Sequence, residues 1–191
     1  MKLSVVIPFY NEENMIQKMY DELVKEINQI TKAEFEIIFI NDGSKDRTFE
    51  RMLAIAAGDS RVKYISFSRN FGKEAGTIAG LEYATGEAVI LMDGDLQHPP
   101  ALIPQMIAAY EEGYDVVSAR RTRTGEKPHR TFLAKHFYKL ANKMMDIELM
   151  DGVSEFRLFS RKVVNAIISM QEYNRFSKGI FAWVGFNEKV I

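Results

Sequence analysis

The chain has 191 residues, of which 47% are hydrophobic and 27% charged, enough to bury one substantial core. Its 25 Lys and Arg residues are balanced by 26 Asp and Glu residues, so the chain lacks the positive charge typical of a nucleic-acid-binding protein. It has no cysteine, which excludes disulfide frameworks, zinc sites built on thiolates and cysteine nucleophiles.

Short apolar runs alternate along the chain with segments of helical period. The first run, residues 3–7, ends at Pro8 and predicts a strand rather than a signal peptide. A helix is predicted next, because apolar residues recur at steps of three and four at Ile16, Met19, Leu23, Ile27 and Ile30. Further strands are predicted over residues 35–40, 62–67, 88–92 and 115–119, and further helices over residues 46–57, 74–84 and 100–112. The alternation predicts one α/β domain with a parallel sheet flanked by helices.

Polar residues follow each of the first four predicted strands. They are Tyr10, Asn11 and Glu12, then Asn41, Asp42, Gly43 and Ser44, then Ser68, Arg69 and Asn70, and finally Asp93, Gly94 and Asp95. Any one cluster could consist of turn formers and helix caps. Since the carboxyl ends of parallel strands meet at one edge of the sheet, the four together predict a single ligand site.

The last of these clusters predicts a metal site. Asp93 and Asp95 are two residues apart, so in extended backbone their carboxylates face the same side and repel unless a cation lies between them. Oxygen ligands favour Mg²⁺ or Mn²⁺ over zinc, and Gln97 could supply or orient a further ligand. Such an ion would neutralise the charge on a departing nucleoside diphosphate.

Several motifs resemble, in the same order, those of family 2 glycosyltransferases, which have the Rossmann-like GT-A fold. They are SVVIPFYNE at residues 4–12, NDGSKD at 41–46, RNFGK at 69–73 and DGDLQHPP at 93–100. Within that family the chain most resembles the polyprenyl-phosphate glycosyltransferases, which include dolichol-phosphate mannose synthases and bactoprenol glucosyltransferases. FRL at residues 156–158 and RFSKGIFAWVG at 175–185 resemble later motifs of that group.

The resemblance implies an inverting, metal-dependent transfer of a sugar from a UDP-, GDP- or dTDP-sugar to a polyprenyl phosphate. The nucleotide sugar is then expected to contact Pro8, Tyr10, Asn11, Glu12, Asp42, Gly43, Ser44, Lys73, Asp93 and Gly94. The metal is expected at Asp93, Asp95 and Gln97. Asp42 could bind the nucleotide base or cap the helix that begins near Asp46, and the sequence leaves both roles open.

Residues 120–143 contain eight basic residues and a single acidic one, Glu126. Three of the basic residues, Lys135, Lys139 and Lys143, are spaced by four and form one stripe on a predicted helix. The stripe could be an ordinary solvated face or could lie at an anionic membrane surface. The resemblance favours the membrane and implies that Arg120 and Arg130 meet the acceptor phosphate, for which guanidinium groups are suited.

An acidic residue stands directly before the FRL motif, at Glu155, where related enzymes usually have Asp. Glu155 could be a general base, could orient the acceptor, or could be a structural partner of Arg157, and Asp151 is the other candidate base. The expected catalytic residues are thus Asp93, Asp95 and Glu155. A phosphate monoester is already an anion near neutral pH, so a strong base is optional.

Two other functions stay open. The chain could be a family 2 glycosyltransferase that acts on a polysaccharide or a protein glycan, or a non-catalytic module that binds sugar nucleotides. The resemblance further implies that residues 1–191 are a catalytic domain truncated before C-terminal membrane helices and acting at the cytoplasmic face of the membrane. We expect this fragment to be soluble, because no segment approaches the roughly 18 apolar residues that span a bilayer. We expect no nucleic-acid partner, and a homo-oligomer stays open.

Overall fold

The structure is a computed structural model that describes residues 1–120, 153–170 and 185–191. Its strands are β1 (Lys2–Phe9), β2 (Glu34–Asn41), β3 (Val62–Ser66), β4 (Ala88–Leu91), β5 (Val116–Arg120), β6 (Val153–Ser160) and β7 (Glu188–Val190). Its helices are α1 (Ile16–Ile27), α2 (Thr48–Gly58), α3 (Lys73–Tyr83), α4 (Ile103–Glu111) and α6 (Arg161–Ser169), and a 3₁₀ turn, η1 (Pro100–Leu102), precedes α4. Within these ranges, no helix combines the length and the apolar character that a membrane span requires.

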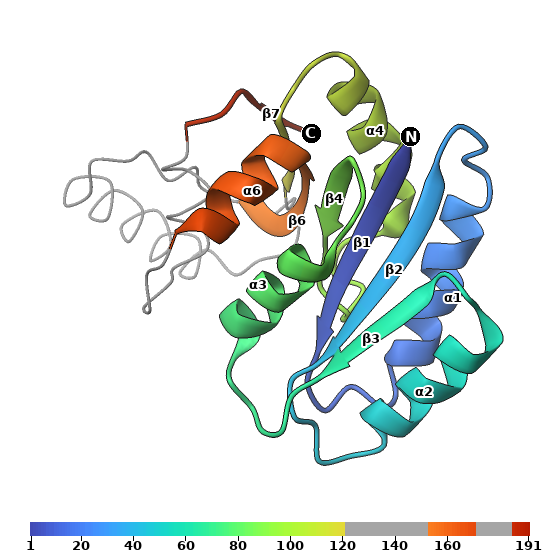
Figure 1. Cartoon of the computed structure of the whole chain (residues 1–191). Coiled ribbons are helices and arrows are strands. Elements are labelled where there is room, and N and C mark those ends of the chain that lie inside the picture. Colours follow the sequence, from blue (N-terminus) through green and yellow to red (C-terminus); the bar gives the residue numbers. More distant parts are fainter. Residues whose placement is uncertain (121–152, 171–184) are drawn as a thin grey trace, which may run out of the picture.

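The strands form one sheet in the order β3-β2-β1-β4-β6-β5-β7 (Figure 1). Strands β1 to β4 are parallel to one another, and β7 is parallel to β5. Strand β6 is antiparallel to both of its neighbours, β4 and β5. The predicted α/β fold with a mostly parallel sheet is confirmed. The five predicted strands and four predicted helices are present with ends shifted by a few residues, whereas β6, β7 and α6 were not predicted.

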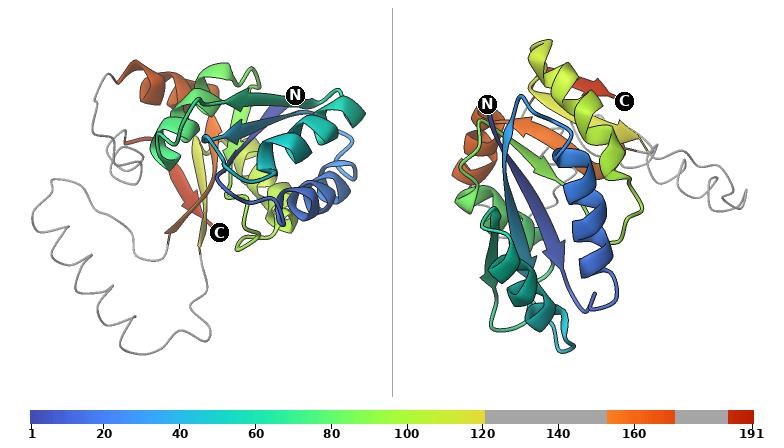
Figure 2. Two further views of the ribbon diagram at one scale, coloured as in Figure 1. Left: turned by 90° about the horizontal axis from the view of Figure 1, so that it is seen from below. Right: turned by 90° about the vertical axis from the view of Figure 1, so that its right-hand side faces the viewer.

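Helices cover both faces of the sheet because its strands are apolar on both sides (Figure 2). Along β1, Val5 and Ile7 belong to the core shared with α1, α2 and α4, while Val6 faces the core shared with α3 and α6. Helix α1 buries its predicted stripe almost completely, from Ile16 to Ile27. The layered core therefore fixes the strand ends where the polar clusters lie.

Helix α3 packs unusually close to β1. A Cβ atom added to Gly80 would lie 2.2 Å from Cγ1 of Val6, closer than any real contact. Only a residue without a side chain fits at Gly80, so this glycine lets α3 lie close to β1. The packing matters for the site, because α3 begins with Lys73 at the sheet edge where β1 ends.

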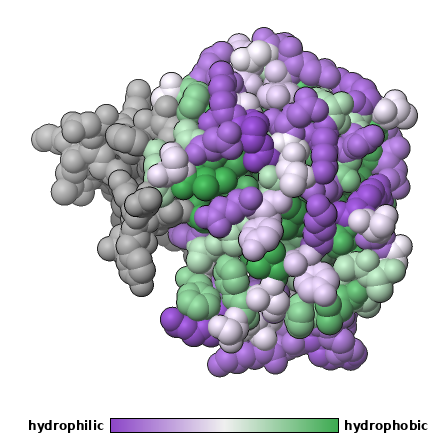
Figure 3. Space-filling model, in the orientation of Figure 1, coloured by the Kyte–Doolittle hydropathy of each residue, from purple (hydrophilic) through white to green (hydrophobic). Residues whose placement is uncertain are grey.

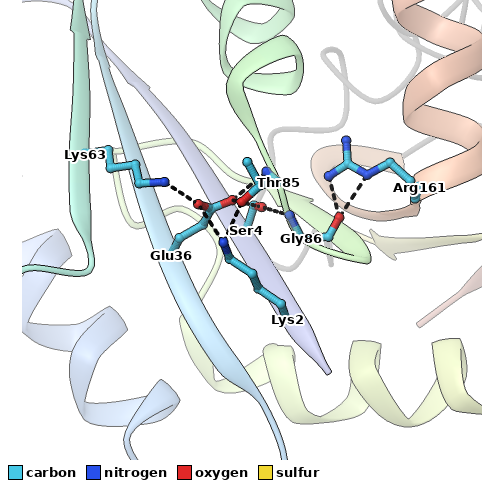
Figure 4. A network of polar contacts seen from close by, with 7 residues as sticks. All are labelled: Lys2, Ser4, Glu36, Lys63, Thr85, Gly86 and Arg161. Atoms are coloured by element: carbon cyan, nitrogen blue, oxygen red, sulfur yellow. Dashed lines mark hydrogen bonds and ion pairs between the residues drawn. The ribbon is translucent and has the colours of Figure 1, made fainter.

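A buried carboxylate holds the opposite edge of the sheet together (Figure 4). Glu36 of β2 is only 3% exposed, and it accepts hydrogen bonds from the hydroxyl of Ser4 at 2.5 Å and from the main-chain N–H of Thr85 at 2.6 Å. The Nζ of Lys63 lies 2.8 Å from its other oxygen. Burial alone would raise the pKa of Glu36, but these donors outweigh it and lower the pKa to about 2. The ionised carboxylate thus ties β1, β2 and β3 to the turn that leads into β4.

Candidate active site

A cavity of about 320 Å³ lies at the carboxyl ends of β1, β2 and β4 and at the start of α3. The residues that line it are Pro8, Phe9, Tyr10, Glu12, Asp42, Asn70, Gly72, Lys73, Asp93, Gly94 and Asp95. Polar clusters that are far apart in the sequence therefore meet in one place, as expected for the carboxyl edge of a parallel sheet. Seven of the expected nucleotide-sugar residues are among them.

A second cavity, of about 490 Å³, adjoins the first and shares Tyr10 and Asn70 with it. It contains two further expected residues, Gly43 and Ser44. The β2–α2 loop that carries them lies at the lower edge of the molecule in Figure 1, where the surface in Figure 3 shows a band of hydrophilic residues. The two cavities share two lining residues and have volumes of about 320 and 490 Å³, so together they could hold a ligand with several parts.

Asn11 joins two of the loops at this edge. Its main-chain N–H donates to the hydroxyl of Ser44 at 3.0 Å, and its side-chain oxygen accepts the N–H of Lys45 at 2.8 Å. Asn11 thus holds the β1–α1 loop against the β2–α2 loop. This placement gives Asn11 a role in shaping the site through the loops.

Asp42 is buried and supports the start of α3. Its two carboxylate oxygens accept the N–H of Phe71 at 2.7 Å and the N–H of Gly72 at 3.0 Å. The alternative that Asp42 caps α2 is wrong, because both of its oxygens bind N–H groups before α3; ahead of α2, it is Asp46 that accepts the N–H of Thr48, at 3.0 Å. Since Asp42 also lines the first cavity, it connects the shape of the cavity to the position of α3.

Gly94 separates the two acidic residues because no side chain fits there. An added Cβ atom would lie 2.3 Å from Cε1 of Phe9. The Phe9 ring is itself held by an edge-to-face contact with Phe39, with centroids 5.3 Å apart. The acidic pair therefore sits against a rigid aromatic support. Strand β4 ends at Leu91, so the pair follows the strand in a turn and not in the extended backbone that the sequence predicted.

The cavity collects negative charge. Asp93 and Asp95 both line it, and Oδ1 of Asp93 lies 2.5 Å from Nζ of Lys73. Burial raises the pKa of Glu12, and the charges of Asp95 and Asp46 raise it further. An electronegative pocket of this kind favours the binding of a cation.

The donors in the cavity fit a divalent ion that binds oxygen. Among the described residues, no three His, Cys, Asp or Glu side chains converge to hold a metal on their own. Asp93 and Asp95 could supply two carboxylate ligands, which suits Mg²⁺ or Mn²⁺ because Mg²⁺ sites commonly use one or two carboxylates and complete their shell with phosphate and water. Gln97 is exposed, and its main-chain N–H donates to Asp95 at 3.0 Å, so the contact seen for Gln97 orients a carboxylate.

Part of the expected acceptor region lies outside the described residues. This part comprises Arg130, Lys135, Lys139, Lys143, Asp151 and most of the late motif at residues 175–185. Arg120 is described: it is exposed at the end of β5, and its main-chain N–H donates to the carbonyl of Ile191 at 2.8 Å.

Glu155 lies on β6, the strand that pairs with β4. In the antiparallel register of β4 and β6, the last paired residues are Leu91 and Arg157, and Glu155 comes two residues before Arg157 on β6. Arg157 is buried, with its Nε donating to the carbonyl of Ser154 at 3.1 Å and its Nη1 3.5 Å from Oε1 of Glu188. Arg157 therefore links β6 to β7, while Glu155 is half-buried and is not among the residues that line the two cavities.

Three residues that line the cavity had no individual role in the sequence prediction: Phe9, Asn70 and Gly72. Asn70 belongs to the polar cluster after β3, and that signal could have identified it. Gly72 precedes α3, and its contribution is a main-chain N–H, which a residue type does not reveal. Phe9 is apolar and is placed by the packing of β1 alone.

Comparison with known proteins agrees with this arrangement. The family model described as "Glycosyl transferase family 2" matches residues 4–168. A putative glycosyltransferase of Bacillus subtilis, CsbB, is 51% identical over 189 residues, which are 99% of this chain and 57% of that protein. The bactoprenol glucosyl transferase of Shigella phage SfX is 44% identical over 192 residues, covering 100% of this chain and 63% of that protein. The chain thus spans about three fifths of the length of these relatives.

A solved structure has the same fold. The mannosyltransferase PcManGT from Pyrobaculum calidifontis, in complex with GDP-Man and Mn²⁺, superposes with a TM-score of 0.69 at 18% identity, covering 99% of this chain and 54% of that one. The GT-A fold implied by the sequence motifs is confirmed. With a family model that matches most of its length and relatives of this similarity, the chain belongs to glycosyl transferase family 2.

Proposed function

We propose that the chain is the catalytic part of an enzyme that transfers a sugar from a nucleotide diphosphate to a polyprenyl phosphate. The observation that carries this proposal is the meeting of Asp93, Asp95 and Glu12 with Lys73 in one cavity at the carboxyl edge of the sheet. The bactoprenol glucosyl transferase, 44% identical, supports a lipid phosphate as the acceptor. The structural likeness to a mannosyltransferase in complex with GDP-Man and Mn²⁺ agrees with a nucleotide-sugar donor and a divalent metal.

The two cavities divide the donor between them. Tyr10 lines both, which suits the ribose that joins a base to a diphosphate. The second cavity, with Gly43 and Ser44, would then hold the nucleoside, and the first would hold the diphosphate beside Lys73. Pro8, Glu12, Asp42 and Gly94 shape the walls of the first cavity.

Charge on the leaving diphosphate is the main obstacle to the reaction. A Mg²⁺ or Mn²⁺ ion held by Asp93 and Asp95 would supply the neutralising charge. The ammonium group of Lys73, which lines the same cavity, would add a second positive charge. A single in-line displacement on the sugar inverts its anomeric centre, because the acceptor attacks opposite to the leaving diphosphate.

The acceptor is an anion before it reacts. A phosphate monoester has a second pKa of about 6, so its oxygen attacks without prior removal of a proton near neutral pH. Glu155, on the strand next to β4, would then orient the acceptor more than deprotonate it. Arg120, with Arg130, would hold the acceptor phosphate through paired guanidinium donors. A lipid acceptor places the reaction at the cytoplasmic face of a membrane, to which the basic segment of residues 120–143 would be attracted.

Two measurements test the proposal in sequence. Thermal unfolding is first recorded with UDP-, GDP- and dTDP-sugars, each with and without Mn²⁺, and a donor present at about 100 times its Kd stabilises the fold by about 2.7 kcal/mol. The donor that stabilises the chain is then incubated with a polyprenyl phosphate in mixed micelles, and with the same polyprenol lacking the phosphate as a control. We expect sugar transfer only to the phosphate. If the donor binds and its sugar is transferred to a polysaccharide or a protein glycan instead, the lipid is not the acceptor. If the donor binds and its sugar is transferred to none of these acceptors, the chain is a non-catalytic module.

A further inference from the structure

The start of α3 places a cation directly on an expected metal ligand. Lys73 is the first residue of α3, and its Nζ lies 2.5 Å from Oδ1 of Asp93. The two side chains are 45% and 30% exposed, so both can exchange partners without unfolding the site. At this distance the ammonium and the carboxylate form an ion pair that includes a charge-assisted hydrogen bond.

Lys73 is the one cationic residue among the described residues that line this cavity. The carboxylates of Asp95 and Glu12 line the same cavity, so the charge around Lys73 is mainly negative. The N–H groups of Phe71 and Gly72, which would otherwise attract an anion to the start of α3, are already bound by Asp42. A diphosphate that enters this cavity therefore has Lys73 as its positively charged side-chain partner.

We propose that Lys73 couples the binding of the metal to the binding of the diphosphate. The inference rests on the function proposed above. Without a divalent ion, the ammonium of Lys73 neutralises Asp93; when a divalent ion binds Asp93, that ammonium is repelled and turns to the diphosphate. A lysine suits this exchange because its ammonium is a compact charge on a flexible four-carbon stem.

Two effects of opposite sign follow for the metal. Lys73 opposes binding of a divalent ion to the empty site, because the ion must displace it from Asp93. Lys73 assists binding of the ion together with a diphosphate, because the displaced ammonium then gains an anionic partner. The metal and the nucleoside diphosphate thus strengthen each other's binding by the same factor, and part of that factor depends on this side chain.

The test is a binding cycle on the full 191-residue chain. Calorimetry measures the affinity for Mn²⁺ alone and in the presence of UDP, GDP or dTDP in turn, for the wild type and for Lys73→Met, which keeps the length of the side chain and removes its charge. Lys73→Arg is the conservative variant. Lys162→Met is the matched control, because Nζ of Lys162 pairs with Asp115 at 2.7 Å and neither residue lines the cavity. Thermal unfolding checks that each variant folds.

We expect Lys73→Met to bind Mn²⁺ alone more tightly than the wild type. The nucleotide raises the affinity for Mn²⁺ by a certain factor, and we expect this factor to be about tenfold smaller in Lys73→Met. A tenfold change lies within the range of about 5- to 150-fold typical of coupled ligands. Lys73→Arg should retain most of the coupling, and Lys162→Met should match the wild type in both values.

The inference is overturned if folded Lys73→Met binds Mn²⁺ no more tightly than the wild type. It is also overturned if the nucleotide raises the affinity for Mn²⁺ by the same factor in both proteins. A loss of nucleotide binding in Lys73→Met with no change in its affinity for Mn²⁺ alone would make Lys73 a simple phosphate contact and would also overturn it. If the wild type itself binds neither Mn²⁺ nor any of the three nucleotides, the proposed function fails first. The two failures are therefore distinguishable.

Discussion

The Asp42 carboxylate accepts the main-chain N–H of Gly72 at 3.0 Å, which fixes the end of β2 to the start of α3. Its other oxygen accepts the N–H of Phe71. Asn in place of Asp42 offers one oxygen, and its amide group would face an N–H that has lost its acceptor. We predict that Asp42→Asn lowers the free energy of unfolding in urea by about 1–3 kcal/mol.

Asp21→Asn is the control for this substitution. Asp21 is exposed on α1 and accepts a hydrogen bond from Gln17, so the change should alter the free energy of unfolding by less than about 0.5 kcal/mol. An Asp42→Asn protein as stable as the wild type would show that the loop before α3 does not depend on this carboxylate.

Gly80 and Gly58 form a matched pair for testing the close approach of α3 to β1. Gly80→Ala would place a methyl group 2.2 Å from Cγ1 of Val6, and we expect a loss of about 1–3 kcal/mol in unfolding free energy from overpacking. Gly58→Ala, at the end of α2, meets no atom within 4 Å and should stabilise the chain slightly, since Ala is the better helix former. Equal stability of the two variants in urea unfolding would contradict the packing described for α3.

Glu36 makes the free energy of unfolding depend on pH. Its pKa is about 2 in the folded chain against 4.5 without the fold, so its contribution is fully present above about pH 4.5 and disappears as the pH falls toward 2. From this difference we expect Glu36→Gln to be less stable than the wild type at pH 7 by on the order of 3 kcal/mol. Measured by urea unfolding, the difference in unfolding free energy between the wild type and Glu36→Gln should become smaller as the pH falls from 4.5 to 2.5. A difference in unfolding free energy that is the same at pH 4.5 and pH 2.5 would show that the ionised carboxylate does not stabilise the fold.

Glu155 can be tested for its role in the proposed transfer. A general base typically contributes about 100- to 10,000-fold to the rate. Because a phosphate acceptor needs little deprotonation, we predict that Glu155→Gln lowers kcat by less than about tenfold, with most of the effect in KM for the polyprenyl phosphate. A hundredfold or larger fall in kcat, with KM unchanged and restored by Glu155→Asp, would instead assign Glu155 as the base.

Much of the parallel half of the sheet could be predicted from local patterns. The stripe from Ile16 to Ile27 has helical spacing, and β1 and β4 are short apolar runs that end in polar residues. The edge rule for parallel strands then brings Tyr10, Asp42 and Asp95 to one place, and the structure shows them lining one cavity.

The antiparallel strand β6 was missed for a physical reason. Its pairing with β4 and β5 joins segments distant in sequence, and no local pattern encodes which edge a strand joins. In the sequence, the charged Glu155 and Arg157 alternate with the apolar Phe156 and Leu158, a pattern that indicates a strand. Contacts such as Asp42 with the N–H of Gly72 depend on loop backbone, which residue types do not specify.

The central claim, a divalent ion and a nucleoside diphosphate bound together at Asp93 and Asp95, is tested most directly by calorimetry on Asp95→Ala. UDP, GDP and dTDP are titrated in turn, with and without Mn²⁺, into the wild type, Asp95→Ala and the surface control Asp21→Ala. The account predicts Mn²⁺-dependent binding of at least one nucleotide to the wild type and the control, and a loss of that binding by at least about tenfold in a folded Asp95→Ala protein. Binding that is unchanged by Asp95→Ala, or equally strong with Mn²⁺ removed by a chelator, would contradict it.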